Sequence, residues 1–209
     1  MSAGELATFL GWFTFGVALW TLLEWLIHGK LGHGRKARNR FAKEHARHHA
    51  TTQYIAGWAI KFLVLTPVAL MIWVLVLPIL GDHLNATGFV AGLALMYLYY
   101  EMLHRIIHRR PPRSWYGRWA RIHHFHHHFH SPRTNLGVTS PIWDKVFGTY
   151  VPVQVPVSIP ARHAIPWMLD PHTGDIAAPF AADYVLVRRG RGAQLPTPVE
   201  SGLGGHGSR

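Results

Sequence analysis

The sequence of 209 residues contains no cysteine. This absence excludes disulfide bonds, thiolate zinc sites, iron–sulfur clusters and cysteine nucleophiles. Charged residues are also scarce: they make up 15% of the chain, against about a quarter in an ordinary soluble domain, while hydrophobic residues reach 49%. The shortage of charge predicts a molecular surface that does not face water everywhere.

Acidic residues are the scarcer of the two charged classes. Asp and Glu number 10 against 21 Lys and Arg, which gives a formal net charge of +11. Such an excess suits nucleic acid, anionic lipid or the cytoplasmic face of a membrane protein. Because the positive charge is concentrated in particular loops between apolar segments, we expect no nucleic-acid partner.

Three long apolar runs, at residues 6–27, 54–80 and 86–103, predict membrane-spanning helices. At about 1.5 Å per residue, the first run reaches about 33 Å, enough to cross a hydrocarbon core about 30 Å thick. It has neither a basic segment before it nor a small-residue cleavage site, so we interpret it as an anchor and not a signal peptide. Pro67 interrupts the second run, which leaves a re-entrant or four-helix arrangement as the alternative to three crossings.

The loops between these runs predict their orientation. Basic residues are concentrated at residues 28–50 and after residue 104, whereas the turn at residues 81–88 has no Lys or Arg. By the positive-inside rule, the two basic regions lie in the cytoplasm and the amino terminus lies on the opposite side. We therefore expect an all-α integral membrane protein with three, or alternatively four, transmembrane helices and a cytoplasmic helical cap rich in histidine.

The 17 histidines are the most unusual feature, and ten of them form four ordered clusters. These clusters are His28 and His33; His45, His48 and His49; His104 and His108; and His124, His127 and His128. In a helix, positions i, i+3 and i+4 share one face, so each of the last three clusters can point to one centre. The first pair lies about 140° apart on a straight helix, and the nearby glycines at positions 29, 32 and 34 allow a helix end and turn that return the second histidine.

All four clusters are expected at one membrane face, because they lie at the ends of spans or in basic segments. Ten imidazoles exceed what one ion needs, and two metals with about five nitrogens each is the natural number; such a donor set suits iron, zinc, copper or nickel. His123, His126 and His130 lie off the chosen helix face and are expected to contact ligands or solvent. The remaining histidines, His83, His163, His172 and His206, are expected to be structural or at the surface.

Carboxylates offer one competing pattern. Glu101 stands three residues before His104, the Glu-x-x-His spacing of carboxylate-rich di-iron bundles. Those bundles need a second such motif and two further glutamates, and neither Glu24 nor Glu44 completes the set. We expect Glu24 and Glu101 to be hydrogen-bond partners that orient ligand histidines, with helix packing as the alternative.

The ordered motifs HX4H, HX2HH, HX3H and HX2HH, followed by NLGVTSPIWDKVFGTY at residues 135–150, resemble the membrane fatty acid hydroxylase and sterol desaturase superfamily. The resemblance covers about residues 5–152, and alignment backward from Gly137 selects His124, His127 and His128 over His123, His126 and His127. It implies a binuclear non-haem iron centre on the ten clustered histidines, O2 as co-substrate, and attack on an unactivated C–H bond of a lipid. It also implies that Asp144 hydrogen-bonds a ligand histidine. Zinc can replace the iron in a purified sample.

The function predicted from this resemblance is that of a membrane-bound, O2-dependent di-iron oxygenase that hydroxylates a fatty-acyl or related lipid. A sterol-type desaturase and a carotenoid hydroxylase are the alternatives within the enzyme class. A membrane metal-binding or transport protein is the alternative from another class, although a transporter places its ligands nearer the bilayer midplane. The sequence shows no cytochrome, flavin or ferredoxin module, so we expect a separate electron donor, namely a cytochrome, ferredoxin or flavin reductase.

Three segments are predicted along the chain. Residues 1–152 form the membrane hydroxylase domain with its histidine-based di-metal centre. Residues 153–187 form an extended or irregular cytoplasmic extension, because valine and proline alternate at its start and proline excludes regular helix. Residues 188–209 are rich in Gly, Pro, Arg and Ser and are predicted to be a disordered tail.

Overall fold

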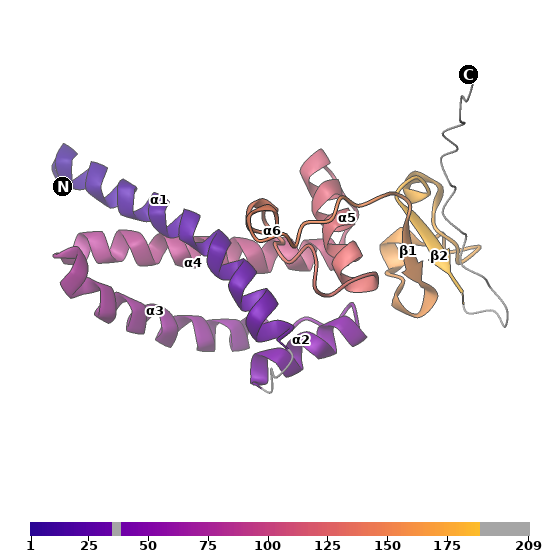
Figure 1. The fold of residues 1–209 in the computed structure, drawn as a ribbon, viewed down its shortest axis with the longest axis horizontal. Helices are drawn as coiled ribbons and strands as arrows, with labels where there is room; N and C mark the ends of the chain where they lie inside the picture. Colours follow the sequence, from indigo (N-terminus) through magenta and orange to yellow (C-terminus); the bar gives the residue numbers. More distant parts are fainter. Residues whose placement is uncertain (35–38, 189–209) are drawn as a thin grey trace, which may run out of the picture.

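The computed structural model describes residues 1–34 and 39–188 and shows a mainly helical chain (Figure 1). The α-helices are α1 (Ala3–Leu26), α2 (Arg40–Ala50), α3 (Trp58–Leu80), α4 (His83–Arg109), α5 (Trp115–Phe129) and α6 (Ile142–Val146). A π-helical turn, η1 (Ile27–Gly32), continues α1, and three short 3-10 turns, η2 (Ala161–His163), η3 (Pro166–Met168) and η4 (Ala178–Phe180), lie between strands β1 (Val157–Pro160) and β2 (Tyr184–Val187). The predicted tail lies outside the described residues, apart from Arg188.

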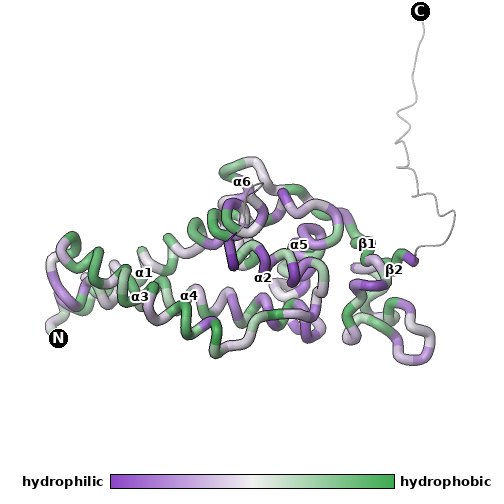
Figure 2. Tube along the Cα trace, turned by 90° about the horizontal axis from the view of Figure 1, so that it is seen from below, coloured by the Kyte–Doolittle hydropathy of each residue, from purple (hydrophilic) through white to green (hydrophobic). Residues whose placement is uncertain are grey.

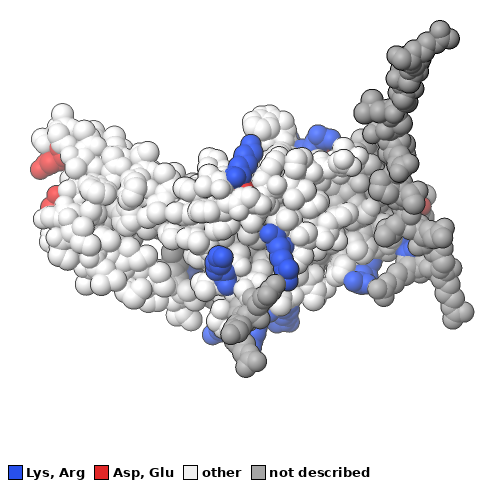
Figure 3. All heavy atoms as spheres, in the orientation of Figure 1, with Lys and Arg blue, Asp and Glu red and all other residues white. Residues whose placement is uncertain are grey.

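Helices α1, α3 and α4 form a long arm that ends at the amino terminus (Figure 1). Within the described residues, three helical segments are long and apolar enough to cross a membrane: Ala3–Gly32, Trp58–Leu80 and His83–Arg109. The arm is mostly apolar in Figure 2, and the face seen in Figure 3 carries Lys and Arg only beyond it. The prediction of a helical membrane protein is confirmed, with three candidate spans in the described chain.

Local signals set the ends of these helices. Ser2 and Glu5 form a capping box at the start of α1, in which the backbone N–H of Glu5 donates to Ser2 Oγ at 3.2 Å. Between α3 and α4, Gly81 adopts a φ of 84°, the left-handed conformation that glycine tolerates without strain. Asp82 then caps α4 by accepting from the N–H of Asn85 at 2.8 Å. These two residues turn the chain sharply, so α3 and α4 run antiparallel.

Glycines allow α1 and α4 to approach each other closely. A Cβ on Gly92 would lie 2.1 Å from the carbonyl oxygen of Phe13, and a Cβ on Gly16 would lie 2.3 Å from that of Phe89. Real Cβ atoms do not occur at such distances, so backbone packs on backbone here, as in other membrane helix pairs that use small residues. By contrast, α3 has no buried residue and presents apolar side chains outward. The pair α1–α4 is therefore the closely packed part of the arm.

Arg121 on α5 joins the arm to the helices beyond it. Its guanidinium is buried and donates to the carbonyl oxygens of Ile106, Arg110 and Pro111 at the end of α4, and to that of Gly117. The last carbonyls of a helix have no partner within the helix, so this one side chain caps α4. The contact fixes α5 against the part of α4 that carries histidines.

Residues 153–187 pack on the other side of α5. Strands β1 and β2 pair in parallel, with Val157 opposite Tyr184. Ile159, Met168 and Tyr184 are buried in one apolar cluster with Phe125 of α5. The sequence predicted extended or irregular chain here but not the strand pairing, because the partner strands lie more than twenty residues apart. The division into a membrane domain and an extension stays a prediction.

We predict that Gly92→Ala destabilises the protein by about 1–3 kcal/mol, because the new methyl group forces the α1 and α4 backbones apart. Thermal unfolding in detergent measures the change. The matched control is Gly11→Ala on α1, where a Cβ meets nothing within 4 Å. Equal melting temperatures for the two variants would contradict the close packing described here.

Candidate metal centre

The ten clustered histidines converge on two adjacent groups at the inner end of the arm, and each group could hold a metal ion. Site A consists of His28, His33, His45, His49 and His127. Site B consists of His48, His104, His108, His124 and His128. Within each site, one nitrogen from every ring lies within 4.8 Å of the other four. Side chains from α1–η1, α2, α4 and α5, spread over a hundred positions of sequence, thus form two compact sets of nitrogen donors.

Helices α2 and α5 each contribute to both sites, which differs from the expectation that each triad points to one centre. His45 and His49 face site A while His48 faces site B. The physical reason is the helical twist of about 100° per residue: positions i and i+4 lie about 40° apart, but i+3 lies about 60° to the other side of i. On α5 the arrangement is reversed, since His124 and His128 face site B and His127 faces site A.

His33 reaches site A through a π-helical turn and not through a glycine turn. The backbone N–H of His33 donates to the carbonyl of His28 at 3.2 Å, the i to i+5 bond of a π-helix. This wider turn brings two residues five apart onto the same side of the chain. The nearby glycines provide space instead: a Cβ on Gly32 would lie 3.1 Å from the ring of His45, and one on Gly29 would lie 2.8 Å from Leu136.

Backbone carbonyls fix the orientation of three rings. The Nδ1 atoms of His28, His48 and His127 lie 2.5, 2.8 and 2.9 Å from the carbonyl oxygens of residues 136, 54 and 134. A carbonyl oxygen only accepts, so each of these Nδ1 atoms carries the proton of the neutral imidazole. The Nε2 atom of each ring is then unprotonated, and its lone pair points into its site.

Lone pairs directed at one another repel unless a cation lies between them. The Nε2 atoms of His28 and His45 are 3.1 Å apart, and those of His127 and His33 are 3.0 Å apart. In site B, the Nε2 of His48 is buried and has no hydrogen-bond partner within the described chain. The unpartnered lone pair of His48 and the convergence of five ring nitrogens in each site fit a metal ion.

Burial keeps the imidazoles neutral. It lowers the pKa of His48 to about 4 and, together with the neighbouring rings of site A, lowers the pKa of His49 to about 2. Burial also lowers the pKa of His33 to about 4, with a smaller effect from His28. Since a histidine must be unprotonated to bind a metal, these rings are ready to bind one at neutral pH.

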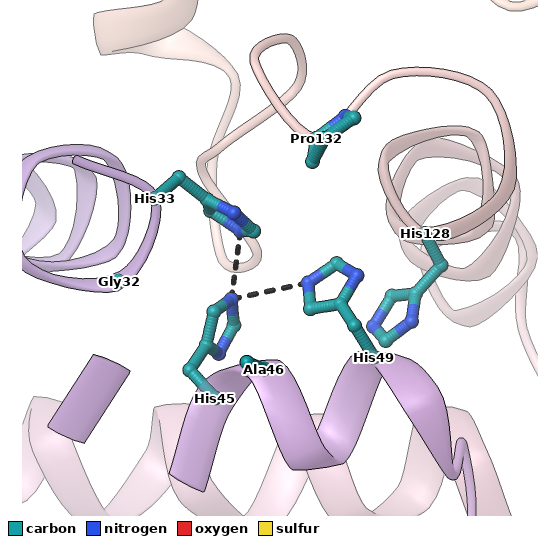
Figure 4. A pocket seen from close by; sticks show the side chains of 7 residues that line it. All are labelled: Gly32, His33, His45, Ala46, His49, His128 and Pro132. Carbon is teal, nitrogen blue, oxygen red and sulfur yellow. Dashed lines mark hydrogen bonds between the residues drawn. The ribbon is translucent and has the colours of Figure 1, made fainter. Parts of the chain in front are cut away.

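A pocket of about 270 Å³ opens onto site A (Figure 4). It is lined by Gly32, His33, His45, Ala46, His49, His128 and Pro132. In the close view, the rings of His33 and His49 point toward His45, and the ring of His128 from α5 lies against that of His49. The centroids of the last two rings are 4.0 Å apart with an interplanar angle of 13°, so this stack connects the two sites.

Asp144 supports His28 through the loop that precedes α6. Its carboxylate accepts hydrogen bonds from the backbone N–H groups of Leu136 and Gly137, each at 2.8 Å, and from the hydroxyl of Thr149 at 2.6 Å. The carbonyl of Leu136 is the one that orients His28. The neighbouring ring of His123, together with these bonds, stabilises the charged carboxylate and lowers the pKa of Asp144 in spite of its burial. The aspartate thus orients a histidine of site A indirectly.

The two glutamates expected to orient histidines contact other groups. Glu24 accepts from the backbone N–H groups of Val138 and Thr139, at 2.5 and 2.9 Å, and holds the same loop as Asp144. Glu101 accepts from Lys61 Nζ at 2.6 Å. Among the described residues, neither carboxylate hydrogen-bonds a histidine, because each points to a neighbouring segment and not along its own helix.

Histidines outside the two sites take varied positions. His123 is buried, lies 3.5 Å from an oxygen of Asp144 and stacks on Trp119 with a centroid distance of 5.0 Å. The rings of His126 and His130 stack on each other. His83 stacks on Trp73, His163 is part-buried, His172 is exposed, and His206 lies outside the described residues. The three orienting carbonyls were not predicted, since backbone groups carry no sequence signal.

We predict that His127→Ala and His124→Ala, in sites A and B, each lower the metal content from about two ions per chain to about one, because each removes a central ligand. Elemental analysis of protein purified with iron measures this content. His172→Ala, at an exposed position, is the matched control and should keep both ions. An unchanged content in both site variants would exclude these groups as metal sites.

We also predict that Asp144→Asn weakens metal binding by about 10-fold to 100-fold, because an amide nitrogen cannot accept the bonds that hold the Leu136 carbonyl toward His28. Competition with a chelator measures the affinity. The control is Asp175→Asn, which removes a carboxylate from an exposed pair with Arg188. Equal affinities for both variants would show that the loop keeps its position without the Asp144 charge.

Comparison with known proteins agrees with this geometry. Residues 13–149 match the family model described as fatty acid hydroxylase. The chain is 31% identical over 141 residues to the dihydroceramide fatty acyl 2-hydroxylase FAH2 of Arabidopsis thaliana, and 32% identical over 156 residues to the fatty acid 2-hydroxylase of Homo sapiens. The first alignment covers 65% of this chain and 58% of the plant protein, and the second covers 69% and 40%. The chain thus spans about half the length of these relatives.

A solved structure, "Full length scs7p (only hydroxylase domain visible)", superposes with a TM-score of 0.57 at 28% identity. The superposition covers 72% of this chain and 59% of the other. The ceramide very long chain fatty acid hydroxylase SCS7 of Saccharomyces cerevisiae is 31% identical over 156 residues, covering 70% of this chain and 39% of the relative. The helical arm, the two histidine groups and the sequence comparisons agree with one another. The chain belongs to the fatty acid hydroxylase family.

Proposed function

We propose that this chain is a membrane-bound, O2-dependent di-iron oxygenase that hydroxylates an acyl chain of a lipid. The observation that carries this proposal is the pair of five-imidazole groups at the end of an apolar helical arm. The relatives named above are fatty acid and ceramide hydroxylases, which supports a lipid substrate and hydroxylation in preference to desaturation. Metal ligands at the ends of spans also disfavour a transporter, in which polar groups lie within the membrane.

The ten histidines of sites A and B are the proposed ligands of two irons. When bound, these irons supply the O2 reduction and C–H cleavage that acid–base side chains cannot perform. The overall change is balanced: the lipid C–H bond, O2, two electrons and two protons give a lipid alcohol and water. Both groups consist of histidines, so imidazole nitrogens are the donors that the protein would offer to the irons.

The protein's own groups hold these ligands in place. The carbonyls of residues 54, 134 and 136 set the tautomer of three rings, so that their Nε2 atoms face the metal. The Arg121 cap keeps α5 in register with α4, and therefore keeps His124 near His104 and His108, at Nε2 distances of 3.1 and 3.0 Å. Burial of these rings excludes water, which protects a reactive site from side reactions.

The acyl chain enters from the bilayer, and the electrons come from a separate donor on the basic side. On the face seen in Figure 3, Lys and Arg gather around the histidine-bearing end, which supports a cytoplasmic location for the two sites and an amino terminus on the opposite side. A cytochrome, ferredoxin or flavin reductase is the proposed donor class. By analogy with the 2-hydroxylases, the oxidised carbon is the one next to the acyl carbonyl.

Lipid analysis of an expressing strain tests the proposal. We expect hydroxylated acyl chains in cells that carry the wild-type chain and at least a 100-fold lower level in cells that carry His48→Ala, since site B loses a ligand. His172→Ala is the control and should keep the wild-type product. A hydroxylated lipid that persists in the His48→Ala strain, or none in the wild-type strain supplied with a reductase, would contradict the proposed function.

A further inference from the structure

Three charged residues form a cluster inside the membrane arm, beside site B. Lys61, in the first turn of α3, donates to Glu101 Oε1 of α4 at 2.6 Å. Arg105, one turn further along α4, places Nη2 3.8 Å from the other oxygen, Glu101 Oε2. We call Lys61, Glu101 and Arg105 the charge cluster. Ionisable groups inside spans are costly and most often serve a function, so this cluster needs an explanation.

The charge cluster is not balanced within itself. Two cations face one carboxylate, which leaves a surplus of one positive charge. Glu101 Oε2 and Arg105 Nε are buried and have no hydrogen-bond partner within the described chain. Arg105 is otherwise occupied, because it donates to the carbonyl of Ala56 at 2.5 Å and lies over the ring of Trp58 at 4.4 Å. The cluster therefore has unused polar atoms and one more positive than negative charge.

Lys61 is the member that remains accessible. Its side chain is 22% exposed, whereas that of Glu101 is 2% exposed. An ammonium group has three N–H donors, and only one hydrogen bond occupies them here. A lysine at a span end ordinarily extends toward water, but Lys61 turns inward to α4. Because no residue of α3 is buried, the exposed part of the Lys61 side chain lies at the outer surface of the arm.

The charge cluster and site B are neighbours. Glu101 precedes His104 by three residues and so lies one turn away on the same helix face. The segment that contains Ala56, held by Arg105, also supplies the Tyr54 carbonyl that orients His48.

We propose that the charge cluster, through Lys61, binds the acyl carbonyl oxygen of the lipid substrate. This inference rests on the proposed function and adds the part of the site that recognises substrate. If the oxidised carbon is bonded to the carbonyl carbon, a contact that fixes the carbonyl also fixes the reacting carbon, whatever the length of the acyl chain. A donor with surplus positive charge, beside site B and open to the bilayer, meets this requirement. The same chemistry serves a free fatty acid carboxylate and the amide carbonyl of an N-acyl lipid.

The double variant Lys61→Met/Glu101→Gln tests the proposal. It removes both partners of the ion pair together, because loss of the lysine alone would leave the buried carboxylate with only the more distant Arg105. Lys43→Met, an exposed lysine on α2, is the matched control. For each protein, metal content, the position of hydroxylation on palmitate and on N-palmitoyl sphinganine, and the equilibrium binding of radiolabelled palmitate are measured. These readouts separate substrate binding from damage to the metal sites.

We expect the double variant to keep its metal but to bind palmitate at least 10-fold more weakly, and to distribute hydroxyl groups over several carbons. The charged carboxylate of palmitate should lose more affinity than the neutral N-palmitoyl lipid. The conservative single variant Lys61→Arg should bind palmitate with an affinity within a few-fold of that of the wild-type protein. If the double variant fails to fold, Lys61→Gln, which keeps a donor toward Glu101 but removes the charge, should show the same loss of palmitate binding.

A folded, metal-loaded double variant with wild-type affinity and a single hydroxylation position would overturn this inference and leave the proposed function intact. A wild-type protein that forms no hydroxylated lipid would instead contradict the proposed function, and palmitate binding would then decide the inference by itself. Equal losses for Lys43→Met and the double variant would show a general effect of charge and would also overturn it.

Discussion

The convergence of neutral imidazole nitrogens on two points is the constraint on which the rest of the structure depends. Three rings are held with Nε2 unprotonated and inward, and the remaining rings are packed within 4.8 Å of them. Without cations, such an arrangement concentrates negative ends of dipoles in a buried space, which is unfavourable. The capping of α4 by Arg121, the loop held by Asp144 and the π-helical turn all oppose the tendency of these rings to separate.

The sequence predicted much of this arrangement because ligand spacing and apolar length are local properties. Three spans follow from runs of apolar residues, and the ten histidines follow from i, i+3 and i+4 spacing and a family resemblance. The division of the triads between two sites could have been predicted from the same helical geometry, since His48 and His127 are the i+3 members. What could not be predicted depends on tertiary contacts: the carbonyl partners, the π-helical turn at His33, and the Lys61–Glu101 pair between helices.

The arm and the metal-binding end are built on different packing principles. Backbone contact at Gly16 and Gly92 makes α1 and α4 a close pair, and the same helix α4 supplies His104 and His108 to site B. Helix α3 packs more loosely, with side chains turned to the surroundings. A closely packed wall that bears ligands and a loosely packed helix that bears Lys61 together suit a site that must hold metals firmly while admitting a long, flexible substrate.

The reciprocal exchange of histidines between α2 and α5 makes the two ions interdependent. Since α2 gives two rings to site A and one to site B, and α5 gives the opposite, ordering either helix around one ion also places a ligand for the other. By thermodynamic linkage, the gain in affinity that one ion gives its neighbour through this ordering is the same in both directions. Loading of the wild-type chain should therefore be cooperative, and the single ion left in a variant of one site should be bound less tightly than either ion of the filled wild-type protein.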